Sequence, residues 1–124
     1  MPSNLQPRLM LDTTHVIFEV SQVATPKLDE KTKVQKLDFE TQLPVWMVVL
    51  YARGRGWSAV FNVAVCNVEK PTADVCEQVI PTGLEAFPWA NKRKDGDINS
   101  GVSFKCTALE PVETRVPAMA GTSA

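Results

Sequence analysis

The chain has 124 residues, of which 44% are hydrophobic and 22% are charged, and its formal net charge is −1. This length fits one domain, and the composition is ordinary for a globular protein that folds without metals or disulfides. The small net charge excludes a global attraction to nucleic acid, so any such binding needs a local patch.

The sequence carries no membrane-targeting pattern. No stretch approaches the roughly 18 to 20 apolar residues that cross a bilayer, and the N-terminus lacks a basic region followed by an apolar stretch and a cleavage site. We therefore expect a cytoplasmic protein with no membrane partner. We divide the chain into an N-terminal extension over residues 1–12, one domain over 13–112 and a flexible tail over 113–124.

The first predicted strand covers residues 15–25. Val16, Phe18 and Val20 alternate with more polar positions, which is typical of a strand with one face against the core. Pro26 then ends the segment, and the charged residues that follow it predict an exposed turn.

The next two segments differ in how they distribute apolar residues. Residues 34–39 carry Leu37 and Phe39 on one face and charged side chains on the other, which predicts a second, half-buried strand. Residues 45–52 are apolar on both faces and rich in β-branched and aromatic residues, which indicates a central strand that includes Trp46 in the barrel wall.

A short basic loop follows the central strand. Residues 53–56 read Arg-Gly-Arg-Gly, and an alternating pattern resumes over residues 57–68. We interpret the two segments as a hairpin in which Gly54 and Gly56 supply the positive φ angles of the turn.

The last third of the chain is more irregular. Residues 72–80 fit either one short helix, with Thr72 at its N-cap, or an extended connection. A short strand is expected over 84–87, a loop over 90–100 and a final strand over 101–109. The side chains of the final strand that we expect to face inward are Val102, Phe104, Cys106 and Ala108.

These elements predict an all-β fold with five or six strands and at most one short helix. The order favours a small five-stranded barrel of the oligonucleotide-binding (OB) type, although an SH3-like barrel or a small sandwich would give similar patterns. In an OB barrel, residues 26–33 and 90–100 would occupy the two loops that flank the ligand groove.

The residue types that enzymes need are scarce. His15 is the single histidine, and the three cysteines lack a CxxC spacing, which argues against a zinc ribbon and a disulfide framework. We expect Cys66 and Cys106 to be small strand residues and Cys76 to be an exposed thiol. The phosphate-binding, dinucleotide-binding and zinc-peptidase motifs are also missing. We therefore predict a non-enzymatic protein without a cofactor or a metal.

Two clusters combine aromatic and basic residues: the first spans Tyr51 to Trp57 around the basic loop, and the second spans Trp89 to Lys94. A groove for single-stranded nucleic acid needs flat rings on which bases stack and cations for the phosphates. Purely structural roles are the alternative for these residues: Trp57 and Trp89 also fit a hydrophobic core, and the basic run before Asp95 also fits a solvated turn. The candidate residues for binding nucleic acid are Tyr51, Arg53, Arg55, Trp57, Trp89, Lys92, Arg93 and Lys94. Because these cations are few, we expect weak binding that self-association into a homo-oligomer strengthens.

Four segments carry a resemblance to a known family. In chain order they read "VQKLDFETQLPVWMVVLYARGRG", "WSAVFNVAV", "TGLEAFPW" and "GVSFKCTALEPV". Their order resembles the replication, integration and excision activators encoded on integrative and conjugative plasmids of actinobacteria, over roughly Phe18 to Val112. The resemblance implies a non-enzymatic accessory protein of plasmid or phage-like replication, a context rich in single-stranded DNA.

Two functions from different classes follow. The first is a single-stranded DNA-binding module that acts in plasmid, mobile-element or phage DNA replication. The second is a regulatory adaptor that docks a replication protein or another partner through a strand edge and aromatic residues, without contact to nucleic acid. The sequence pI of about 5.8 favours the second function.

Overall fold

The structure is a computed structural model that describes residues 7–112. Within this range the protein is all β, as predicted, with eight strands and no helix. The predicted flexible tail, residues 113–124, lies outside the described residues. The strands are β1 (Leu9–Met10), β2 (Ile17–Pro26), β3 (Val45–Gly54), β4 (Trp57–Cys66), β5 (Gln78–Thr82), β6 (Glu85–Lys92), β7 (Ile98–Cys106) and β8 (Ala108–Pro111).

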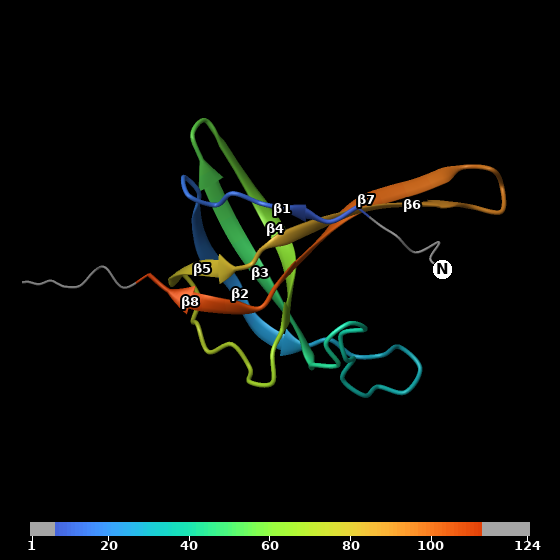
Figure 1. The fold of residues 1–124 in the computed structure, drawn as a ribbon, viewed down its shortest axis with the longest axis horizontal. Coiled ribbons are helices and arrows are strands. Elements are labelled where there is room, and N and C mark those ends of the chain that lie inside the picture. Colours follow the sequence, from blue (N-terminus) through green and yellow to red (C-terminus); the bar gives the residue numbers. More distant parts are fainter. Residues whose placement is uncertain (1–6, 113–124) are drawn as a thin grey trace, which may run out of the picture.

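All eight strands of the described residues belong to one curled sheet (Figure 1). Their order is β1-β6-β7-β4-β3-β2-β5-β8, and β4 and β7 run parallel while the other neighbours are antiparallel. The edge strands β1 and β8 do not pair with each other, so the sheet is an open half-barrel. The predicted five-stranded closed barrel is therefore wrong. One cause is the short β4–β7 ladder of three residue pairs, beyond which β6 and β7 leave the barrel.

Strands β2, β3 and β4 supply most of the core. Long β3–β4 pairing puts Val48 opposite Val63 and Leu50 opposite Phe61, on the inner face of the curl. Two register shifts in β2 add local twist and bend this strand around the core. The predicted strands over 15–25, 45–52 and 57–68 are confirmed within one or two residues at most ends. The fully buried large side chains are Leu50, Val20, Val48, Val63, Val65, Val79 and Cys106.

The predicted second strand over residues 34–39 is wrong. The long connection between β2 and β3 forms only two isolated bridges, Leu28 with Gln35 and Leu37 with Pro44. Phe39, expected to face inward, is 85% exposed. Asp29 accepts hydrogen bonds from backbone amides two and three residues further on, and such local turns compete with an extended ladder.

The C-terminal third also departs from expectation. Residues 72–77 are extended or turn, without a helix, before β5 begins. The expected loop over 90–100 is largely a hairpin, since β6–β7 pairing continues to Lys92 opposite Ile98. Val102, expected to face the core, is 51% exposed because the hairpin has already left the barrel at this point. Residues 9 and 10 of the expected N-terminal extension join the sheet as β1.

Candidate functional site

The outer part of the β6–β7 hairpin projects from the barrel (Figure 1). Strand β1 pairs with β6 only at Glu85 and Ala86, and β4 pairs with β7 only from Phe104 onward. Residues 87–103 therefore form a two-stranded ribbon, which we call the hairpin arm. Its residues 90–100 are all exposed.

Trp57, which is exposed, and Trp89, which is half-buried, each lie over a glycine on the neighbouring strand. Trp89 is directly opposite Gly101, and a Cβ atom placed on Gly101 would come within 2.8 Å of the indole. Trp57 is opposite Gly54, and a Cβ there would overlap its ring. An aromatic ring that covers a glycine in a sheet protects a backbone that has no side chain of its own. Gly54 thus serves as a platform within β3, and of the two glycines only Gly56 has a positive φ, at +80°.

The sheet places Trp57 and Trp89 on opposite faces. Trp57 alternates with Phe61 and Val63 on the inner face, and the parallel ladder puts Val63 beside Phe104. Ala86 is opposite Phe104 and therefore lies on the inner face. Trp89 is three residues further along β6, so the alternation of side chains places it on the outer face. Trp46 is partly buried beside the core, and its indole N–H donates to the Asn67 carbonyl at 3.0 Å.

The first predicted cluster is divided between these faces. Tyr51 and Arg53 lie on the outer face, opposite Val60 and Ser58, whereas Trp57 is 46% exposed on the inner face. Arg53 also approaches Glu19, with 3.8 Å between the guanidinium and carboxylate atoms. Arg55 is exposed in the two-residue turn.

Trp57 borders an apolar cavity of about 230 Å³ on the inner face. The segment that leads from β1 to β2 covers one side, and the edge-to-face pair Phe61–Phe104, with ring centroids 4.7 Å apart, lies on another. The cavity-lining residues are Leu11, Asp12, Thr13, Val16, Phe18, Trp57, Phe61, Val63, Leu84 and Phe104.

The second predicted cluster stays on one element. Trp89, Lys92, Arg93 and Lys94 all belong to the hairpin arm, with the three cations at its exposed tip. The tip is ordered by backbone bonds, including donation from the Arg93 amide to the Asp97 carbonyl at 2.7 Å.

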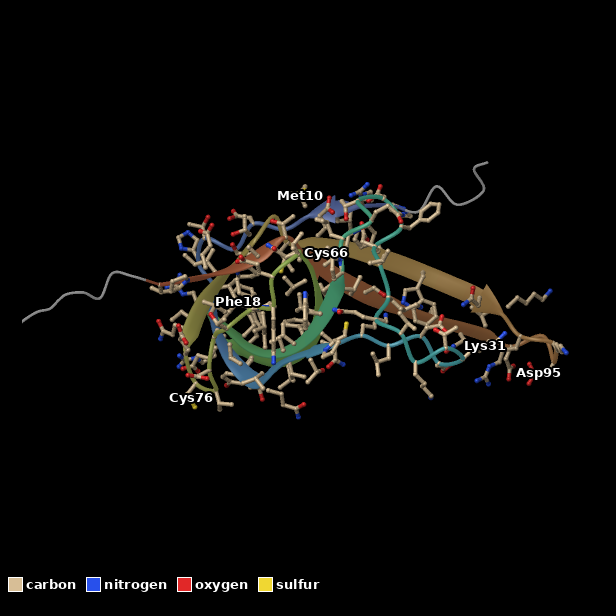
Figure 2. All side chains as sticks on the ribbon, turned by 90° about the horizontal axis from the view of Figure 1, so that it is seen from below. Met10, Phe18, Lys31, Cys66, Cys76 and Asp95 are labelled. Carbon is tan, nitrogen blue, oxygen red and sulfur yellow. The ribbon has the colours of Figure 1, made fainter. Side chains whose placement is uncertain are left out.

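The structure does not bring the two clusters into one groove. The β3–β4 turn and the hairpin arm point in different directions (Figure 1). Residues 26–33, the other expected flank of a groove, lie in the β2–β3 connection. Lys31 of this connection and Asp95 of the arm lie toward the same end of the molecule in Figure 2, while Figure 1 separates the two segments.

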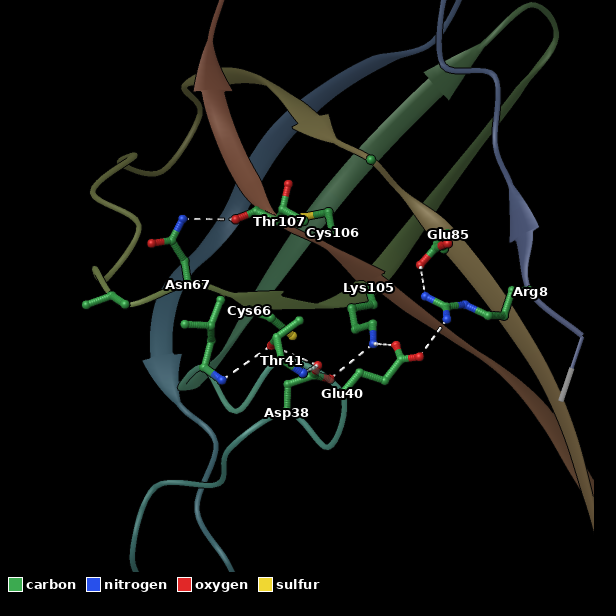
Figure 3. A pocket seen from close by; sticks show the side chains of 13 residues that line it. Arg8, Asp38, Glu40, Thr41, Cys66, Asn67, Glu85, Lys105, Cys106 and Thr107 are labelled. Atoms are coloured by element: carbon green, nitrogen blue, oxygen red, sulfur yellow. Dashed lines mark hydrogen bonds and ion pairs between the residues drawn. The ribbon is translucent and has the colours of Figure 1, made fainter. Parts of the chain in front are cut away.

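An ion-pair network that the sequence did not reveal anchors the β2–β3 connection to the base of the arm (Figure 3). The Lys105 ammonium donates to Asp38 at 3.0 Å and to Glu40 at 3.4 Å. Arg8 donates to Glu40 at 2.7 Å and to Glu85 at 3.0 Å. Both cations also lie about 5 Å from the Phe87 ring centroid, within cation–π distance.

Burial and charge set the protonation of this region. Burial raises the pKa of Asp38, but hydrogen bonds from the Thr41 amide and from Lys105 outweigh it and hold that pKa below its ordinary value. Burial raises the pKa of the Cys66 thiol to about 11, with a further contribution from the Asp38 charge. Burial raises the pKa of Cys106 to about 12. Both thiols are therefore protonated near neutral pH and poor nucleophiles, while Cys76 is exposed, as predicted.

Comparisons of the chain with protein-family models, curated proteins and solved structures found no match. Among residues 7–112, no group of histidine, cysteine, aspartate and glutamate side chains is arranged to hold a metal ion. In the same range, no helix has the length and apolar character to cross a membrane. The functional proposal therefore rests on the residues and their geometry.

Replacing Gly101 by Ala should release Trp89 from the arm. The new Cβ would lie 2.8 Å from the indole, so the ring must turn outward into water. We expect Trp89 to become more accessible to acrylamide, measured by fluorescence quenching, with a change in unfolding free energy within about 1 kcal/mol. The matched control is Ser100→Ala on the opposite face of the same strand. Unchanged quenching in the Gly101 variant would contradict the stacked arrangement.

Proposed function

We propose that this chain is a non-catalytic module that binds single-stranded nucleic acid, DNA in the first instance, through the hairpin arm. The observation that carries the proposal is the combination of one flat ring and three cations on a single exposed ribbon. Trp89 is held over Gly101, and Lys92, Arg93 and Lys94 follow at the tip. We place its activity in plasmid, mobile-element or phage DNA replication, on the resemblance described above.

The chemistry of the outer face of the arm suits this ligand. A base that stacks on an aromatic side chain gains about 1 to 3 kcal/mol, with little dependence on sequence. Asn91 and Asn99 are directly opposite each other and share a face with Trp89, so their amides can donate to and accept from base edges. Lys92 lies three residues from Trp89, about 10 Å along the strand, and on the opposite face of the ribbon, beside Ile98. The long side chains of Lys92, Arg93 and Lys94 therefore supply positive charge at the tip of the arm, where the backbone of a nucleotide stacked on Trp89 would leave the outer face.

The charge of the arm predicts a weak interaction. Three cations at the tip face two carboxylates in the same turn, Asp95 and Asp97. The Asp95 carboxylate accepts a hydrogen bond from the Asp97 amide at 3.0 Å, so it also holds the turn. We therefore expect an affinity that falls steeply as salt rises and that gains from several arms acting together.

The test is a titration of a labelled single-stranded oligonucleotide at several salt concentrations, followed by tryptophan fluorescence and anisotropy. The variant Lys92→Ala, Arg93→Ala, Lys94→Ala should bind more weakly, and the slope of log affinity against log salt should fall by about two. The variant Asp95→Asn, Asp97→Asn should bind more tightly, since it removes the counter-charges and keeps side chains that accept hydrogen bonds.

A charge-matched control separates the arm from net charge. Replacing Lys27, Lys31 and Lys33 by Ala also removes three positive charges, but from the β2–β3 connection instead of the arm. We expect a smaller loss of affinity than for the arm variant. Equal losses would assign binding to overall charge, and a folded protein with no response at low salt would exclude the function.

The alternative is a regulatory adaptor that docks a protein partner without nucleic acid. Its specific support is the backbone of the hairpin arm, because within residues 7–112 no strand pairs with the outer edges of β6 and β7 beyond the barrel. Such edges accept an added strand from another chain. An oligonucleotide titration without response, together with a folded protein, would favour this second function.

A further inference from the structure

The two free edges of the hairpin arm differ in how they are protected. The β6 edge carries Pro88, which cannot donate a backbone hydrogen bond, and ends on Lys92. Prolines and charged residues are the usual means by which an exposed edge avoids pairing with another strand. The β7 edge, residues 98–103, contains neither a proline nor a charged residue. Within residues 7–112 no strand covers this edge, since β4 joins β7 only at Phe104.

Two of these six edge residues expose apolar side chains to solvent. Ile98 is 71% exposed and Val102 is 51% exposed. They are four residues apart with Ser100 midway between them, so all three point to one face of the strand. When two copies of this strand run antiparallel about Ser100, the β-branched residue at one end of each copy lies opposite the β-branched residue at the other end of the second copy.

We propose that the β7 edge of the hairpin arm pairs antiparallel with the β7 edge of a second copy of this chain, about a two-fold axis at Ser100. In this register Ile98 lies opposite Val102 of the second copy, and the reverse pair forms on the other side of the axis. Directly opposite residues of an antiparallel pair share a face. Four exposed β-branched side chains would then cover one another.

The length of the free edge supports this register. Asp97, the residue before β7, falls opposite Ser103 of the second copy, which is the last position before β4 joins the ladder. The turn of each arm therefore begins where the other chain's β7 edge becomes occupied. The pairing needs no displacement of β4, and its product is a four-stranded sheet in the order β6-β7-β7-β6.

The two-fold axis of this pairing is perpendicular to the ribbon, so equivalent faces of the two arms lie on the same side. Trp89, Asn91 and Asn99 of both copies would form one continuous surface, with basic turns toward both ends. Self-association through β7 does not depend on nucleic-acid binding, and it is tested without any oligonucleotide.

The test uses a single cysteine at the proposed axis. In a Cys76→Ser background, which removes the exposed native thiol, Ser100→Cys places one thiol opposite its own copy. The Cα atoms of such a pair are about 4.5 to 5.5 Å apart, within the range that a disulfide spans. We expect mild oxidation to convert most of the protein to a covalent dimer on non-reducing electrophoresis.

Two controls in the same background make the result specific. Ser58→Cys is exposed on β4, away from the arm, and should remain largely monomeric. Asn99→Cys tests the register, because its thiol would face Gly101 of the second copy, and it should cross-link at most a tenth as fast as the Ser100 variant. Faster cross-linking through Asn99 than through Ser100 would overturn the proposed register.

A variant without an added cysteine completes the test. Val102→Lys replaces an exposed side chain, so the fold should survive, and it should raise the dissociation constant of the dimer at least tenfold by analytical ultracentrifugation. A wild-type protein that stays monomeric at concentrations of hundreds of micromolar would overturn the proposal. So would a Val102→Lys variant that dimerises as tightly as the wild type.

Discussion

Replacing Leu50 by Ala should lower the free energy of unfolding by about 2 to 5 kcal/mol, the cost of removing a fully buried leucine and leaving a cavity. Leu50 is 0% exposed in the centre of β3. It lies opposite Phe61 on β4 and Val20 on β2, so three strands meet at its side chain. Urea unfolding followed by tryptophan fluorescence and far-UV circular dichroism gives the measurement.

The matched control is Val60→Ala, on the outer face of the adjoining strand. Val60 is 62% exposed, and we expect its truncation to change stability by at most about 0.5 kcal/mol. Equal losses for the two variants would mean that the inner face is not the principal core. The Leu50 variant, studied under conditions where it is folded, should also keep the oligonucleotide affinity of the wild type, because the hairpin arm stands outside this core.

Strands whose pattern is imposed by burial could be predicted from the sequence. Val48, Leu50 and Ala52 are fully or nearly fully buried on the inner face of β3, and Val63 and Val65 are buried on the same face of the neighbouring strand β4. The burial of these positions requires apolar residues at every second place, and this requirement is visible in the sequence. The neighbouring turn was located correctly, although pairing continues further than expected, to Gly54 opposite Trp57.

The secondary-structure predictions were wrong where a short sequence pattern is compatible with more than one local structure. Leu37 and Phe39 alternate with charged residues as strand residues do, yet the turn that Asp38 forms with Thr41 leaves Phe39 in water. Residues 90–100 carry the polar and charged composition of a loop, with one glycine, Gly96. In the structure they complete a hairpin, because β6 and β7 pair with each other where no core is present.

Part of the candidate site could have been placed better from the sequence. Alternation carried across a turn of two or of four residues between β3 and β4 separates Tyr51 and Arg53 from Trp57. The Asp38–Lys105 contact is different in kind, because 67 residues separate the two side chains and no local pattern links them. Only the β4–β7 ladder, which brings β7 beside the end of β4, makes this contact.

Replacing Asp38 by Ala should destabilise the protein by about 1 to 3 kcal/mol, through its effect on a mostly buried ion pair. The Asp38 carboxylate accepts hydrogen bonds from the amide and the hydroxyl of Thr41 and from Lys105. Without it, the ammonium of Lys105 keeps Glu40, at 3.4 Å, as its one carboxylate partner among the described residues, beside the Phe87 ring. The β2–β3 connection then loses its tightest link to the base of the hairpin arm, and its backbone amides should exchange hydrogen faster.

A double-mutant cycle with Lys105→Met isolates the pair, since each single variant leaves the other charge partly buried. The double variant should lose less stability than the sum of the two single losses. The pH dependence gives an independent check. The pKa of Asp38 is held below its ordinary value of 3.8, so its contribution is present above that pH and is lost as the pH falls through the lowered value.

The pKa of Lys105 is shifted the opposite way. Burial lowers it, but the hydrogen bond and charge of Asp38 raise it above its ordinary value of 10.5. The stabilising contribution of Lys105 is therefore complete below that pH and is lost as the pH rises through the raised value.

The lowered pKa of Asp38 gives a test at acidic pH. The difference in unfolding free energy between the wild type and the variant Asp38→Asn should shrink as the solution is acidified below about pH 4. A difference that stays constant from neutral to acidic pH, together with additive single losses, would show that the two charges do not act as a pair and that packing alone anchors the connection.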